Sequence, residues 1–176
     1  ELTSSSLVGL VTFDSEAEII LDLQPANLER IKDELEKLTV KGVSCIASAV
    51  TKAVNLLEKN RLNGTILLLT DGRANLSLDH SGGFEGSLIL EAELLSISEE
   101  AVRKHVPVHT VSVGEDAFTH TLSVMAKKTN GSHWIIENFK GLNFNPEEIQ
   151  PKIIVKNLRV HAVPAELPSA QPTWAK

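Results

Sequence analysis

The sequence predicts an α/β protein with a doubly wound, Rossmann-like architecture, in which a mostly parallel sheet has helices on both faces and one antiparallel edge hairpin. Two observations support this fold class. From Ile66 onward, short apolar runs alternate with segments of helical periodicity, as in sheets with helical crossovers. Before them, two apolar runs are separated by only a short polar turn. With 176 residues and 42% hydrophobic content, we expect a single core.

The hairpin comes first in the chain. Residues 7–13 form a continuous apolar run, residues 14–17 read as a tight turn, and residues 18–23 form the second strand. Pro25 ends that strand, because proline cannot donate to a strand ladder.

Two helices are expected after the hairpin. Asn27 is a suitable N-cap for the first, and Ser44 is placed to cap the second, which begins at Ile46. Apolar residues recur three or four positions apart in both segments, which predicts one core-facing side for each helix. They are Leu28, Ile31, Leu35 and Leu38 in the first helix, and Ile46, Val50, Ala53, Val54 and Leu57 in the second.

The alternation of strand and helix follows. A polar, glycine-containing stretch over residues 75–87 has no periodicity and is expected to be a long loop. Asn130-Gly131 is a typical helix stop. The predicted elements are a strand at 66–69, a helix at 90–104, a strand at 106–114, a helix at 117–128 and a strand at 133–137.

We expect residues 1–145 to form this α/β domain and residues 146–176 to form a C-terminal extension. The extension contains an apolar run at 152–163 whose Lys and Arg content suits an edge strand, followed by a proline-rich tail. The first residues contain neither an initiator Met nor a signal-like segment, so the chain is read as an excised piece.

Composition argues against several classes of partner. The formal net charge of -6, with acidic and basic residues interspersed, disfavours nucleic acid, and no apolar run is long enough to insert into a membrane.

Cys45 is the single cysteine and is expected to be a small buried hydrophobe. The histidines lack paired spacing, so no zinc site is predicted. A cytoplasmic location is expected, although sequons at Asn63, Asn75 and Asn130 leave an extracellular one open.

A carboxylate follows directly on the buried strand at 66–69. Ligands of parallel α/β sheets bind at the carboxyl ends of the strands, and Asp71 lies there in the stretch ILLLTDGRAN. Ser44, in the loop before a helix, is the second candidate, although its hydroxyl is also suited to capping that helix. A carboxylate and a hydroxyl are ligands for a hard cation, Mg²⁺ or otherwise Mn²⁺ or Ca²⁺.

Four segments, in order, resemble a von Willebrand factor A domain over roughly residues 7–137: LVGLVTFDSEAEIILDL, GVSCIASAVTKAVNLL, GTILLLTDGRAN and VPVHTVSVGEDAFTHTLSVMAKKTNGSHWII. The resemblance implies a metal-ion-dependent adhesion site (MIDAS), in which Asp71 matches the third-loop Asp and Ser44 the second-loop Thr. LLLTDGRAN is also similar to the D-type subunit of magnesium chelatases and related ATPase-partner proteins.

The sequence departs from this family at its start. The family's first strand and its Asp-x-Ser-x-Ser loop, which supplies three of the five usual site residues, have no counterpart before Leu7. Metal binding by this chain is therefore expected to be weak. The missing strand would be central, and unpaired backbone groups there are costly. We expect a segment outside this numbering, another chain or residues 152–163 to fill the gap.

Two functions are compatible with these residues. The first is a metal-dependent interaction module that binds an acidic group, Asp or Glu, of a partner protein, as an accessory to an ATPase or chelatase-like complex. Its partner-binding loops would contain Asn75, Asp79, His80 and Glu115. The alternative is a metal-assisted hydrolase at the same strand ends, for which no general base is evident. We therefore expect a protein that is not an enzyme.

Overall fold

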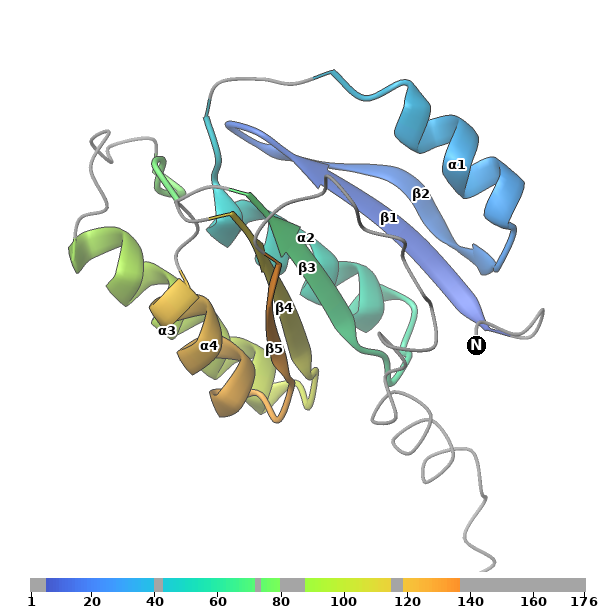
Figure 1. Ribbon diagram of the computed structural model, residues 1–176. Helices are drawn as coiled ribbons and strands as arrows, with labels where there is room; N and C mark the ends of the chain where they lie inside the picture. The colour runs from blue at the N-terminus through green and yellow to red at the C-terminus, as the bar shows by residue number, and fades with distance from the viewer. Residues whose placement is uncertain (1–5, 40–42, 72–73, 80–87, 115–118, 137–176) are drawn as a thin grey trace, which may run out of the picture. The chain divides into compact units, whose positions relative to one another are not determined.

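The computed structural model describes residues 6–39, 43–71, 74–79, 88–114 and 119–136 (Figure 1). All of them belong to one compact unit, Leu2–Leu142. The described strands are β1 (Leu7–Phe13), β2 (Ala17–Pro25), β3 (Ile66–Thr70), β4 (Val108–Val113) and β5 (His133–Ile136). The described helices are α1 (Leu28–Glu36), α2 (Ile46–Lys59), α3 (Leu88–Arg103) and α4 (Thr119–Lys128).

The predicted hairpin is confirmed. β1 pairs antiparallel with β2, with two register shifts near Leu10. Asp14 closes the turn, because its Oδ1 accepts hydrogen bonds from the Ser15 hydroxyl (3.0 Å) and from the Glu16 backbone N–H (3.2 Å). A carboxylate that accepts from the backbone two residues on is a common way to stabilise a turn.

The other three strands form a parallel sheet in the order β3-β4-β5. Every residue of β4 is buried, including the polar His109, Thr110 and Ser112, as expected for the middle strand of the sheet. Leu68 of β3 is aligned with Thr110 of β4, which is aligned with His133 of β5. The predicted fold class, an α/β fold with a parallel sheet, helices and an antiparallel hairpin, is confirmed. The prediction of helices on both faces is not met among the described residues, where the helices that contact the parallel sheet lie on one face.

Helices α2, α3 and α4 form a layer on one face of the parallel sheet (Figure 1). Leu68 and Val108 lie on this face, together with apolar residues of all three helices. The helical members of this core include Ile46, Val50, Val54, Leu90, Leu94, Ile97, Leu122 and Met125. Neighbouring residues of a strand alternate between faces, so Leu67 and Leu69 lie on the opposite face, where they are 53% and 45% exposed.

The two predicted helix caps have different outcomes. Asn27 is the N-cap of α1, and its Oδ1 accepts from the Arg30 backbone N–H at 3.0 Å. Ser44 does not cap α2, because the N-cap position belongs to Cys45 and makes no side-chain capping bond. The prediction for Ser44 was wrong because α2 begins at Ile46, so Ser44 lies one residue before the N-cap position.

β1 and β3 do not pair with each other. Among the described residues they belong to two separate sheets, β1-β2 and β3-β4-β5. Both strands nevertheless contact α2. Direct pairing of β1 with β3, which would have contradicted the expected gap, is not found. Residues 152–163 lie outside the described part of the chain, as does the whole of the predicted extension 146–176, so the boundary at 145 stays a prediction.

Candidate metal and partner site

Asp71 lies where the sequence predicted it, at the carboxyl end of β3. Thr70, the last residue of the strand, is buried, whereas Asp71 is exposed. No hydrogen bond or ion pair joins the Asp71 carboxylate to another residue that the structure describes. The chain therefore passes from the buried core to the surface between these two residues, and the Asp71 carboxylate is in contact with solvent.

Ser44 is held at the same end of the fold by Asn75. The Ser44 backbone N–H donates to Asn75 Oδ1 at 2.7 Å, and the Asn75 backbone N–H donates to the Ser44 carbonyl at 3.2 Å. These two bonds fasten the loop that precedes α2 to the loop that follows β3. They use the backbone of Ser44, so its hydroxyl is not needed to hold the loop.

The end of β1 is fastened to the same place. The Cys45 backbone N–H donates to the Asp14 carbonyl at 2.7 Å, and the Ala17 backbone N–H donates to the Ser48 hydroxyl at 3.0 Å. The carboxyl ends of β1 and β3 thus meet at the first turn of α2. Sequence reasoning treated Asp14 only as a turn residue, although it also directly follows an apolar strand.

The donors that the structure places here suit a hard cation but are few. A carboxylate and a hydroxyl oxygen are appropriate ligands for Mg²⁺, which retains several waters. No group of three His, Cys, Asp or Glu side chains able to hold a metal occurs among the described residues. Asp71 and Ser44 are the described residues that would hold such an ion, and weak binding stays a prediction.

The predicted partner-binding loops are only partly described. Asn75 has a structural role, since it fastens Ser44. Asp79 accepts a hydrogen bond from the buried Ser77 hydroxyl. The intervening Leu78 backbone N–H donates to the Glu93 carboxylate of α3 at 3.0 Å. His80 and Glu115, the other two predicted residues, lie outside the described part of the chain.

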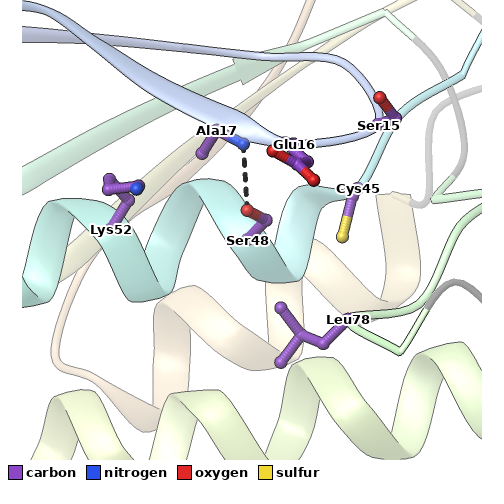
Figure 2. Close-up of a pocket in the computed structure, with 7 residues that line it drawn as sticks. All are labelled: Ser15, Glu16, Ala17, Cys45, Ser48, Lys52 and Leu78. Carbon is purple, nitrogen blue, oxygen red and sulfur yellow. Dashed lines mark hydrogen bonds between the residues drawn. The ribbon is translucent and has the colours of Figure 1, made fainter.

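A polar pocket of about 260 Å³ lies between the hairpin turn and α2 (Figure 2). Its lining includes Glu16, Cys45 and Lys52, with Lys52 about two turns along α2 from Cys45. The Cys45 side chain is only 1% exposed, which confirms the prediction of a small buried residue. Burial raises the pKa of its thiol above the ordinary value, so the nucleophilic thiolate is scarce at neutral pH.

The chain is similar to known proteins in sequence and in fold. The family model described as "von Willebrand factor type A domain" matches residues 2–73. A von Willebrand factor type A protein from Catenulispora acidiphila has a TM-score of 0.68 at 19% identity, over 87% of this chain and 35% of that one. A search of curated protein sequences gave no significant match.

Two further solved structures share the fold. Proximal thread matrix protein 1 from the mussel byssus, solved with a zinc-occupied MIDAS motif, has a TM-score of 0.56 at 20% identity, over 85% of this chain and 34% of that one. The ArnB paralog VWA2 from Sulfolobus acidocaldarius has a TM-score of 0.54 at 15% identity, over 78% and 33%.

The chain spans about a third of the length of these solved structures. None of the comparisons confirms the magnesium-chelatase branch, which stays a prediction. No described helix has the length and apolar character needed to cross a membrane. The sequence match over residues 2–73 and the shared fold of the described elements make this chain similar to von Willebrand factor type A domains.

Proposed function

We propose that this chain is a metal-dependent protein-interaction module that binds an acidic side chain of a partner protein. The observation that carries the proposal is the exposed Asp71 carboxylate at the end of a buried parallel strand, with Ser44 fastened at the same end of the sheet. A cation held by few protein oxygens keeps open positions, and a partner carboxylate is a suitable ligand for one of them.

The hydrogen bonds around Ser44 support this proposal. Asn75 fastens the Ser44 backbone on one side, and the Asp14 carbonyl accepts from the neighbouring Cys45 backbone on the other. A site built on a rigid loop loses less conformational entropy when a ligand binds. The zinc-occupied MIDAS motif of the mussel protein supports the choice of a divalent cation, although that protein is only 20% identical.

The partner is proposed to be a protein presenting Asp or Glu, in an assembly such as an ATPase or chelatase-like complex. A metal-assisted hydrolase at the same edge is the alternative. It additionally needs a general base near the reacting atom. The buried Cys45 thiol, whose pKa burial raises, is not suited to that role.

Affinity capture with a matched control tests the proposal. The immobilised chain is incubated with extract of its source cells in Mg²⁺ and in EDTA, and bound proteins are eluted with EDTA. We expect capture in Mg²⁺ only, its loss in Asp71→Ala, and its retention in Asp33→Ala, which removes an exposed carboxylate on α1. Capture that is equal with and without EDTA contradicts the proposal. Mn²⁺-dependent turnover of phosphate or ester substrates, lost in Asp71→Ala, would favour the hydrolase.

A further inference from the structure

The chain contains two Asn-Gly dipeptides, Asn63-Gly64 and Asn130-Gly131, each between a helix and the strand that follows it. Both asparagine side chains are exposed, and neither makes a hydrogen bond with a residue that the structure describes. Asn-Gly is the dipeptide most prone to spontaneous deamidation, because glycine has no side chain to hinder the approach of its backbone nitrogen to the asparagine amide. Threonine follows one dipeptide and serine the other. By sequence alone, the two sites should therefore react at similar rates.

The Asn130-Gly131 dipeptide takes part in the hydrogen bonds that end α4. The Asn130 backbone N–H donates to the Lys127 carbonyl at 3.3 Å, and the Gly131 N–H donates to the Ala126 carbonyl at 2.8 Å. With Asn130 at φ 60°, these bonds form the Schellman motif that commonly closes a helix. Gly131 is also packed so closely that a Cβ there would overlap the Val108 carbonyl. Its nitrogen is therefore bonded and fixed in position.

The same motif ends α2, but it closes before the earlier dipeptide. The Arg61 N–H donates to the Glu58 carbonyl at 2.9 Å, and the Leu62 N–H donates to the Leu57 carbonyl at 3.1 Å. Arg61 has φ 54° and takes the place that Asn130 has in α4. The dipeptide begins with the next residue, and its glycine N–H makes no hydrogen bond within the described part of the chain.

Packing nevertheless requires glycine at position 64. A Cβ there would be 2.5 Å from the side chain of Leu57, which belongs to the hydrophobic core. The described hydrogen bonds resume at Thr65, whose hydroxyl donates to the Pro107 carbonyl at 3.0 Å, and at Ile66, whose N–H donates to the same carbonyl at 2.9 Å. The fold thus retains the least hindered residue after Asn63 and leaves its nitrogen unbonded in the described structure.

We propose that Asn63 is a site of spontaneous deamidation in the folded protein, and that the Schellman motif of α4 protects Asn130 from the same reaction. Hydroxide removes the Gly64 amide proton, and the nitrogen then attacks Cγ of Asn63. The N–Cγ bond forms as the Cγ–Nδ2 bond breaks, and the side-chain nitrogen leaves as ammonia after taking a proton from water. Water then opens the resulting succinimide ring at either carbonyl and gives aspartate or isoaspartate.

Protection at Asn130 follows from the cost of freeing the attacking nitrogen. The Gly131 nitrogen can attack only after its bond to the Ala126 carbonyl is broken and the glycine moves away from the Val108 carbonyl. Such local opening is populated by only a small fraction of folded molecules. Gly64 requires neither step.

The product has one additional negative charge just before β3, and isoaspartate also adds a methylene group to the main chain there. Asp71 lies beyond the other end of this strand. The modification is therefore independent of the proposed metal site.

Mass spectrometry of aged protein tests the proposal. The full chain is incubated in mildly alkaline buffer, either folded or in concentrated urea, and then digested with trypsin, which separates the sites into peptides 62–73 and 129–140. Fragment ions assign the modified residue, and a zero-time sample corrects for deamidation during digestion. We expect Asn63 of the folded chain to deamidate at least tenfold faster than Asn130. In urea the two rates should converge, because the protecting bonds are lost.

Asn63→Gln is the matched variant. Glutamine keeps the amide but has to close a larger ring, so peptide 62–73 should keep its mass while Asn130 behaves as before. Equal rates at the two sites of the folded chain would overturn the proposal, as would deamidation of Asn63 only in urea. A rate difference that persists in urea would also overturn it, because the sequence rather than the fold would then be its cause.

Discussion

Ser44 and Asn75 are joined by two reciprocal hydrogen bonds across 31 positions of sequence, with the Asn75 side chain accepting from the Ser44 backbone and the Asn75 backbone donating to the Ser44 carbonyl. This relationship brings the loop before α2 and the loop after β3 to one edge of the sheet. It also makes Asn75 a structural residue of the candidate site.

The first prediction concerns this pair. Asn75→Ala leaves the half-buried Ser44 N–H without its acceptor, and the free energy of unfolding should fall by about 1 kcal/mol, near the lower end of the usual cost of such a loss. Asn75→Asp retains an oxygen acceptor and should lose less. Asn63→Ala, at an exposed position, is the control and should change stability by less than ~0.5 kcal/mol. Urea denaturation measures all three, and equal effects of Asn75→Ala and Asn63→Ala would contradict the role of Asn75.

The turn between α4 and β5 requires glycine at position 131. A Cβ at Gly131 would overlap the Val108 carbonyl, a backbone group that cannot move aside easily. Gly131→Ala should therefore cost at least ~3 kcal/mol, at the upper end of the overpacking range. Gly114→Ala is the matched comparison, since Gly114 has φ 79° but open space around it, and it should cost only about 1 kcal/mol of backbone strain. Thermal unfolding that ranks the two variants in the opposite order would refute this reading.

Stability should fall in mild acid because of His109. Burial lowers the pKa of His109 below its ordinary value of 6.5, and its Nδ1 accepts a hydrogen bond from the Ser132 backbone N–H. Since the unfolded chain binds the proton more readily, this contribution is fully present above about pH 6.5 and decreases as pH falls toward the lower folded-state pKa. His133, whose pKa burial also lowers, acts in the same direction.

The unfolding free energy measured between pH 5 and 8 tests this prediction. His109→Asn keeps an acceptor near Nδ1 and should flatten the pH dependence. His120→Asn, at an exposed position on α4, should leave it unchanged. An identical slope in all three proteins would exclude His109 as its origin.

Deletions in the segment after Asn75 should affect partner binding and stability differently. Ser77 is buried and donates to Asp79, while Leu78 is bonded to Glu93 of α3. Deleting residues 80–86 should abolish partner capture and leave the melting temperature nearly unchanged. Extending the deletion to Asp79 removes a hydrogen-bond partner of a buried hydroxyl and should cost about 1 kcal/mol. Partner capture that survives the shorter deletion would place recognition elsewhere.

Local patterns were sufficient to predict most of the strands and helices. The core-facing side predicted for the first helix was wrong, because no residue of α1 is buried in the described part of the chain. The hairpin, the Asn27 cap, the apolar face of α2 and the alternation from β3 to β5 each depend on neighbouring residues, and the structure confirms them. The role of Asn75 could not be predicted this way, because its partner Ser44 is distant in sequence. The β1 end was missed for the same reason, since the bond from Cys45 to the Asp14 carbonyl is made by backbone atoms and leaves no residue-type signal.

Paramagnetic broadening by Mn²⁺ tests the central claim, that Asp71 and Ser44 form a weak divalent-cation site. The isotope-labelled chain is titrated with Mn²⁺ while its amide signals are recorded by NMR. We predict that the signals of Thr70, Asp71 and Ser44 broaden first, only at millimolar concentrations of Mn²⁺ as expected for few protein ligands, and that Asp71→Ala removes this preference. First broadening elsewhere in the chain, or a pattern unchanged by Asp71→Ala, would contradict the account.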